Sequence, residues 1–216
     1  MRVAPSIIAA NFTKFQEEIK RVEKANADLL HLDVMDGVFV PNITFGPLIV
    51  KAINEITDME LDVHLMIVKP EKYLRQFIEA GADWISFHAE ATETTDECIE
   101  IIREQNKKVG LAISPPTPFD RVKKYVDKLD FILIMTVNPG FYGQKFLPEI
   151  LKKIEQTKDW IVTHKPDCLI QVDGGINSRN VVELDRAGVD IVVAGAAVFK
   201  SDDYKKAIKD LKCLKV

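Results

Sequence analysis

The sequence predicts an α/β fold, a closed (β/α)8 or TIM barrel, in a single domain that covers residues 1–216. Short apolar runs alternate with amphipathic stretches along the whole chain, and no low-complexity segment or linker interrupts them. Of the 216 residues 47% are hydrophobic, which is enough for one sizeable core. An open, doubly wound sheet is the alternative, but eight units of strand and helix in this length favour the closed barrel.

Eight apolar runs have the length of buried strands. They are VAPSII (3–8), LLHLDVM (29–35), LDVHLMI (61–67), WISFH (84–88), VGLAI (109–113), FILIMTV (131–137), LIQV (169–172) and IVVAG (191–195). The stretches between them have helical patterns. FTKFQEEIKRVEKA follows Asn11, a predicted N-cap, and LRQFIEAGAD ends in Ala-Gly before the next strand. NVVELDRAGVDIVVAG (180–195) shows one unit whole: a helix, a glycine stop and a strand.

Charge and cysteine content exclude several classes of function. The net charge is −4 and the pI about 5.7, with scattered lysines, so we expect no nucleic-acid partner. No run resembles a secretory or membrane-spanning segment, so we expect a cytoplasmic protein with no membrane partner. Cys98, Cys168 and Cys213 are far apart and form no CxxC pair, which predicts packing roles rather than disulfides or a thiolate metal site.

Polar residues fall at the ends of three predicted strands. The stretch HLDVMDG (31–37) places His31 and Asp33 on one face of a strand, because side chains alternate between faces. LDVHLMI places Asp62 and His64 on one face of the next strand, and Asp173 follows the seventh run. A charge buried in a strand needs a partner such as a cation, a shared proton or a substrate.

In a barrel these strand ends meet at the mouth, where barrel enzymes hold their active sites. The residues that can converge there are His31, Asp33, His64 and Asp173. Nitrogen and oxygen ligands together suit one divalent transition ion, Zn²⁺, Mn²⁺, Fe²⁺ or Co²⁺, better than Ca²⁺. A single strand histidine is more often a hydrogen-bonded core residue, but four such residues at one end of three strands favour a metal site. His88 also ends a strand and its role stays open, whereas His164 is expected at the surface near a helix end.

Glycines follow three consecutive strands at the same end of the predicted barrel. Gly140 and Gly143 lie in TVNPGFYGQKF, Gly174 and Gly175 in VDGGIN, and Gly195 in AGAAVF. Glycines let backbone N–H groups approach an anion, and the loops after strands seven and eight are a recurrent phosphate site in barrels. Each loop alone is equally compatible with a tight turn, but the three together favour a phosphorylated substrate.

APSI, HLDVMDGVFVPNITFGP, LDVHLMI, MTVNPGFYGQKF and VDGGIN have the order and spacing of the ribulose-phosphate 3-epimerase family, which the sequence resembles over essentially its whole length. The resemblance implies a cytoplasmic, homo-oligomeric isomerase of the pentose phosphate pathway. Such an enzyme interconverts D-ribulose 5-phosphate and D-xylulose 5-phosphate with one divalent ion (Zn, Fe, Mn or Co) per subunit.

The resemblance also implies roles for individual residues. The family's metal ligands correspond to His31, Asp33, His64 and Asp173, and its acid/base pair corresponds to Asp33 and Asp173. Its substrate contacts correspond to Ser6, Met35, His64, Met66, Met135, Gly140, Phe141, Tyr142, Gly143, Gly174, Gly175, Gly195 and Ala196. The sequence departs from the usual family residues at five positions, none of them a proposed ligand: Ala9, Asn11, Val38, Tyr142 and Ala196. The departure at Ala196 removes a serine hydroxyl from the phosphate site.

Epimerisation next to a ketone requires a proton to leave one face of the carbon and return to the other, so two acid/base groups must flank a planar enediolate. Asp33 and Asp173, on different strands, can do this. The alternatives are a D-allulose 6-phosphate 3-epimerase with the same ligands and a non-catalytic sugar-phosphate-binding barrel. Related barrels that decarboxylate use an Asp-x-Lys-x-x-Asp cluster, but here Met35 and Val38 occupy the lysine and second aspartate positions.

Overall fold

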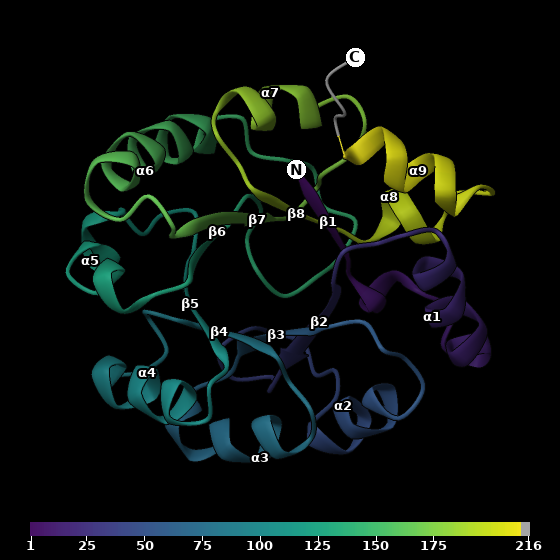
Figure 1. The fold of residues 1–216 in the computed structure, drawn as a ribbon, viewed down its shortest axis with the longest axis horizontal. Helices are drawn as coiled ribbons and strands as arrows, with labels where there is room; N and C mark the ends of the chain where they lie inside the picture. The colour runs from purple at the N-terminus through teal and green to yellow at the C-terminus, as the bar shows by residue number, and fades with distance from the viewer. Residues whose placement is uncertain (213–216) are drawn as a thin grey trace.

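Eight parallel strands form the centre of the molecule in the computed structural model, which describes residues 1–212 (Figure 1). The strands are β1 (Arg2–Pro5), β2 (Leu30–Met35), β3 (Leu61–Met66), β4 (Trp84–His88), β5 (Lys108–Ile113), β6 (Phe131–Met135), β7 (Leu169–Asp173) and β8 (Ile191–Ala194). Each coincides with a predicted run to within two residues, except that the first run ends early. A 3-10 turn over Ile7–Ala9 begins within that run and replaces the end of the strand.

The sheet closes on itself between its first two strands. In the ladder order β1-β8-β7-β6-β5-β4-β3-β2, the first and last members are neighbours in the chain. A parallel bridge between Ser6 and His31 joins them, and the N–H of Asp28 donates to the carbonyl oxygen of Val3 at 2.9 Å. The predicted barrel is therefore confirmed, and the open doubly wound sheet is wrong.

The helices form a ring outside the strands (Figure 1). They are α1 (Phe15–Lys24), α2 (Pro47–Asn54), α3 (Leu74–Glu79), α4 (Thr95–Glu104), α5 (Asp120–Lys123), α6 (Ile150–His164), α7 (Val181–Arg186), α8 (Ala196–Phe199) and α9 (Tyr204–Leu211). Short 3-10 turns add Ile7–Ala9, Phe12–Lys14, Pro70–Lys72 and Val126–Lys128.

The predicted helix ends are present. The side chain of Asn11 accepts a hydrogen bond from the N–H of Thr13 and so caps the 3-10 turn that leads into α1. Gly81 and Gly188 follow α3 and α7 with positive φ, as glycine stops do. His164 is exposed at the end of α6, where its Nδ1 lies 2.8 Å from the carbonyl oxygen of Trp160.

Strand alternation divides the interior into two regions. Residues such as Leu32 and Val34 point outward and pack with the helices in the larger core. The inner face encloses a second apolar cluster, which includes Phe131 and Leu133. Because both faces are covered, β2 and β3 are buried along their whole length. The polar residues of these strands therefore lie inside the barrel, not on its surface.

Two further expectations concern residues outside the barrel mouth. Cys98 and Cys168 are buried and free, and burial raises the pKa of each thiol to about 12, as expected for packing residues. Cys213 lies outside the described residues. Among residues 1–212, the structure contains no helix that combines the length and the apolar character needed to cross a membrane.

Candidate active site and metal centre

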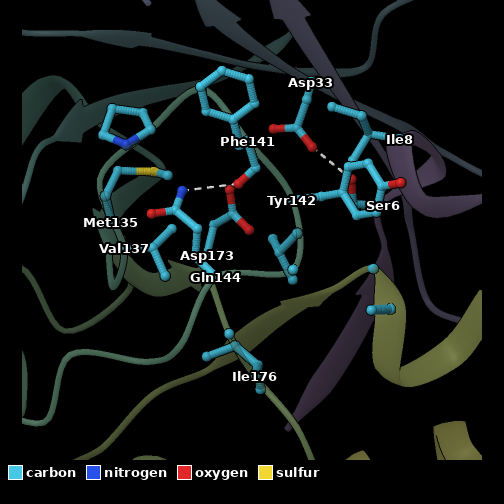
Figure 2. Close-up of a pocket in the computed structure, with 18 of the residues that line it drawn as sticks. Ser6, Ile8, Asp33, Met135, Val137, Phe141, Tyr142, Gln144, Asp173 and Ile176 are labelled. Atoms are coloured by element: carbon cyan, nitrogen blue, oxygen red, sulfur yellow. Dashed lines mark hydrogen bonds between the residues drawn. The ribbon is translucent and has the colours of Figure 1, made fainter.

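A cavity of about 340 Å³ opens at the carboxyl ends of the strands (Figure 2). It is lined by many of the residues singled out from the sequence: Ser6, Asp33, Met35, Met66, Met135, Gly140, Phe141, Tyr142, Gly143, Asp173, Gly174, Gly175, Gly195 and Ala196. His31 and His64 are fully buried and do not line it. Its position and size are those of a small-molecule site in a barrel.

Four predicted ligand side chains come together at this cavity. One nitrogen or oxygen atom from each of His31, Asp33, His64 and Asp173 lies within 4.8 Å of the corresponding atoms of the others. Asp33 Oδ1 lies 3.3 Å from His31 Nε2 and 3.3 Å from His64 Nδ1, and the latter lies 3.9 Å from Asp173 Oδ2. Metal bonds of about 2.1 Å in a tetrahedral arrangement place ligand atoms about 3.4 Å apart. The observed distances therefore fit one divalent ion.

A buried atom without a hydrogen bond supports the same conclusion. His31 Nε2 is fully buried and has no hydrogen-bond partner among the described residues, although it faces the cluster. Burying such a nitrogen costs free energy unless something binds its lone pair. A cation between the four side chains would bind it and would also offset the negative charges of Asp33 and Asp173. The donor set thus fits a metal ion by its geometry and by its charge.

Asp62 and Gln171 orient His31 from the opposite side. The Nδ1 of His31 lies 2.6 Å from Asp62 Oδ2, and the amide of Gln171 donates to the same oxygen. A carboxylate on one imidazole nitrogen leaves the other nitrogen free to bind a metal. Sequence reasoning placed Asp62 on the correct face but gave it no role. The signal is the strand pairing, in which His31 lies opposite Asp62 and Asp33 lies opposite His64.

Asp33 is the most strongly ionised group of the cluster. Burial acts to raise its pKa, but the charge of the nearby His31, together with the contact of His64, outweighs burial and holds the pKa far below its usual range. Ser6 Oγ also donates to Asp33 Oδ2 at 2.5 Å (Figure 2). The pKa of His31 is shifted upward. Burial acts to lower it, but the charges of Asp62 and Asp33 raise it well above the usual value.

Asp173 is shifted in the opposite direction from Asp33. Burial and the nearby negative charge of Asp33 raise its pKa to about 8. Burial lowers the pKa of His64 to about 4, so this imidazole is neutral and able to act as a ligand. Two carboxyl groups whose pKa values are separated by their surroundings are typical of an acid and a base that work on one substrate.

The loop after β6 forms part of the cavity wall. The side-chain amide of Gln144 donates to the carbonyl oxygens of Asn138 and Phe141, and Asn42 Nδ2 donates to that of Gly140 at 2.8 Å. Gly175 has a φ of +67°, and a Cβ there would lie 2.4 Å from the backbone nitrogen of Phe146. The close approach of the two loops therefore requires glycine at this position. Gln144 and Asn42 had no predicted role, because hydrogen bonds within loops leave no periodic pattern.

The positions that depart from the family pattern lie around the mouth. Val38 is 73% exposed and Tyr142 54% exposed, and the Lys200 ammonium lies 5.4 Å from the centroid of the Tyr142 ring. Ala9 packs close to Gly195, where an added Cβ would lie 3.1 Å from its own. Ala196 lines the cavity. None of these residues contacts the ligand atoms of the four-residue cluster.

Comparison with known proteins identifies the family. A model of the ribulose-phosphate 3-epimerase family matches residues 2–199. The chain is 48% identical over 213 residues to the ribulose-phosphate 3-epimerase of Bacillus subtilis, covering 98% of both chains. It is 50% identical over 208 residues to that of Synechocystis sp., covering 95% of this chain and 90% of the relative.

Solved structures of other barrels share the fold at low identity. A 3-keto-L-gulonate-6-phosphate decarboxylase from Vibrio cholerae superimposes with a TM-score of 0.74 at 16% identity, covering 98% of this chain and 95% of that one. A 3-hexulose-6-phosphate synthase from Salmonella typhimurium gives 0.72 at 18%, covering 98% and 96%. These likenesses support the barrel alone. Because the family model and the curated relatives span nearly the whole chain, the chain belongs to the ribulose-phosphate 3-epimerase family.

Proposed function

We propose that the protein is a metal-dependent isomerase that interconverts D-ribulose 5-phosphate and D-xylulose 5-phosphate, a reaction of the pentose phosphate pathway. The observation that carries this proposal is the pair of carboxyl groups at the cavity. Asp33 and Asp173 belong to strands separated by two others in the sheet, and both line the same space (Figure 2). A planar intermediate between them is accessible to one carboxyl group on each face.

The two carboxyl groups act in sequence in this mechanism. One removes the proton from C3 of the ketose and the other returns a proton to the opposite face, so the configuration at C3 inverts through an enediolate. Each general acid/base step is worth roughly 10²–10⁴ in rate. Without the ion their pKa values are separated, low for Asp33 and about 8 for Asp173. The two groups therefore differ in proton affinity, as an acid and a base do.

His31, Asp33, His64 and Asp173 would hold the ion. When bound, a divalent cation supplies a Lewis acid that stabilises the negative charge of the enediolate oxygens. The buried side chains of Met35, Met66 and Met135 line the cavity beside the two carboxyl groups and exclude water from them. Ser6 holds Asp33 through its hydroxyl and is positioned to contact the substrate.

Backbone N–H groups of the glycine loops would bind the phosphate. Gly174, Gly175, Gly195 and Ala196 line one side of the cavity, and no side chain caps the turn that begins at Gly195. Ala196 offers no hydroxyl, so the backbone carries this contact. Lys200 adds a positive charge near the mouth through its contact with Tyr142.

A coupled assay tests the proposal. Protein stripped with a chelator is supplied separately with Zn²⁺, Mn²⁺, Fe²⁺ or Co²⁺, and xylulose 5-phosphate formed from ribulose 5-phosphate is measured. We expect activity to disappear with the metal and to return with at least one ion. D-allulose 6-phosphate is assayed in parallel. A faster reaction with the six-carbon sugar would reject the pentose substrate, and no reaction with either sugar would leave a sugar-phosphate-binding barrel.

We also expect one domain over residues 1–216, a cytoplasmic location and a homo-oligomer.

A groove beside the mouth carries exposed apolar side chains, which favour the homo-oligomer. They are Ile43, Phe12 and Tyr142, which are 75%, 50% and 54% exposed. Large apolar side chains gathered on a surface favour contact with another chain, here a second copy. Light scattering of the purified protein measures the assembly, and Ile43→Glu should shift it toward the monomer. A monomeric wild type would contradict this expectation.

A further inference from the structure

The two ring nitrogens of His64 face different partners. Its Nδ1 lies 3.3 Å from Asp33 Oδ1, inside the four-residue cluster. Its Nε2 lies 2.9 Å from Nε2 of His88, which is fully buried at the end of β4. The ring centroids lie 5.1 Å apart and the ring planes are inclined by 28°, so the two rings meet edge to edge through these nitrogens. His88 thus contacts a predicted metal ligand on the side away from the metal.

The proton positions of this pair are determined by chemistry. A neutral imidazole carries one N–H, and a nitrogen that binds a metal must be unprotonated. If Nδ1 of His64 is the ligand, its Nε2 carries the proton and donates it to His88 Nε2. That nitrogen must then be an acceptor, so the proton of His88 lies on its Nδ1.

Glu90 occupies the position that this arrangement requires. Its Oε2 lies 3.3 Å from Nδ1 of His88. Burial acts to raise the pKa of Glu90, but the hydrogen bonds of His88 and Thr117 outweigh it and lower the pKa to about 2, so the group is an anionic acceptor. Its other oxygen accepts from the Thr117 hydroxyl and, at 2.9 Å, from the N–H of Ser114.

The loop of residues 114–117, which donates these two hydrogen bonds to Glu90, is itself fixed. The ammonium group of Lys153, on α6, donates to the carbonyl oxygens of Ser114, Pro115 and Thr117 at 3.2, 2.7 and 2.7 Å. A continuous series of hydrogen bonds therefore runs from α6 through this loop and Glu90 to His88 and His64. Each member restricts the orientation of the next one.

We propose that His88 and Glu90 are positioning residues. They hold His64 in the tautomer that carries its proton on Nε2, which leaves Nδ1 unprotonated and able to bind the metal. This inference rests on the proposed function, because it concerns a ligand of the same ion. Neither residue touches the substrate cavity, since neither lines it. His88 reaches the four-residue cluster through its contact with His64. The arrangement parallels the contact of Asp62 with His31, except that a second histidine lies between the carboxylate and the ligand.

The experiment measures zinc binding rather than activity alone. Zn²⁺ affinity is determined by competition with a chromogenic chelator for the wild type, His88→Leu, His88→Gln and Glu90→Gln. The exposed His164→Gln is the control for loss of a histidine. The ¹⁵N shifts of the histidine rings in the zinc-loaded proteins report which nitrogen of His64 is protonated. Circular dichroism and thermal unfolding confirm that each variant is folded.

We expect His88→Leu to weaken zinc binding 10- to 100-fold and to change the tautomer of His64. Glu90→Gln should have a smaller effect in the same direction, and His88→Gln should recover part of the affinity, because its amide oxygen can still accept from His64. The control should match the wild type. If His88→Leu does not fold, Glu90→Gln carries the test, because its side chain lies at the partly exposed end of the series.

Two results separate this inference from the proposed function. Zinc binding and a His64 tautomer unchanged in folded His88→Leu and Glu90→Gln would overturn the positioning role and leave the metal site intact. A wild-type protein that binds no zinc would overturn the four-residue metal site itself, and the positioning role with it.

Discussion

Replacement of Asp33 by asparagine tests the proposed chemistry most directly. The side chain is 6% exposed, accepts from Ser6 and lies 3.3 Å from a nitrogen of each cluster histidine. Asparagine has nearly the same shape and can still accept from the Ser6 hydroxyl through its amide oxygen. Asp33→Asn should therefore fold, but it lacks both the negative charge that binds a metal and the base that moves a proton.

The expected loss follows from these two roles. One general acid/base step is worth about 10²–10⁴ in rate, or about 3 to 5 kcal/mol. Loss of one of the four ligands weakens a Lewis acid that contributes several kcal/mol more. The sum predicts that kcat falls by at least about 10⁴, even at saturating metal. Ser6→Ala removes the hydrogen bond to Asp33 but keeps the carboxylate, so its effect should be much smaller and mainly on KM.

The coupled assay measures kcat and KM of both variants, and exchange of the C3 proton in D₂O measures proton removal without epimerisation. In a mechanism with one carboxyl group per face, Asp173→Asn should still exchange this proton in one epimer and not in the other. More than 1% of wild-type kcat in folded, metal-loaded Asp33→Asn would refute the assignment. An equally large loss in Ser6→Ala would show that the role given to the hydroxyl is wrong.

Three further predictions concern the surroundings of the site. In metal-free protein the pKa of Asp173 is raised from 3.8 to about 8, so between about pH 6.5 and 8 the folded state keeps a proton that the unfolded state has lost. Stability should fall as pH rises in this window, by up to about 1.4 kcal/mol per pH unit for one proton, and the raised pKa of His31 acts in the same direction. The free energy of unfolding, measured with urea in the presence of a chelator at several pH values, should depend less on pH in Asp173→Asn than in the wild type. An unchanged pH dependence would contradict the raised pKa of Asp173. Gly175→Ala places a side chain at a φ of +67° and 2.4 Å from the nitrogen of Phe146. The free energy of unfolding in urea should therefore fall by at least about 1 kcal/mol, and KM should rise. Wild-type values of both would mean that the loop adapts. Asp62→Asn removes the anionic partner 2.6 Å from His31 Nδ1, so zinc binding measured by chelator competition should weaken about 10- to 100-fold, and wild-type affinity would exclude an orienting role.

The strands and the metal ligands could be predicted because they depend on local pattern. A buried parallel strand is a short apolar run, so eight such runs mark eight strands. Polar residues at regular two-residue spacing inside such runs, as in His31 and Asp33, mark an inner face. Recognition of the family motifs then assigned roles that spacing alone left open.

The early end of the first strand was not predictable from its composition. Residues 3–8 are suitable for a strand throughout, but beyond Pro5 the chain turns so that Ser6 bridges to His31 and its hydroxyl reaches Asp33. The contact that ends the strand comes from another strand. Local propensity contains no information about that partner.

The sequence by itself therefore determined the barrel, the inward face of each polar strand and the four candidate ligands. Tertiary structure decided which atoms of those residues meet. Register sets His31 opposite Asp62 and Asp33 opposite His64, so one aspartate orients a ligand while the other joins the cluster. It also places His88 against His64, two residues 24 positions apart. The physical reason is that alternation along a strand is a local property, whereas the depth of a side chain in the barrel depends on how neighbouring strands are staggered.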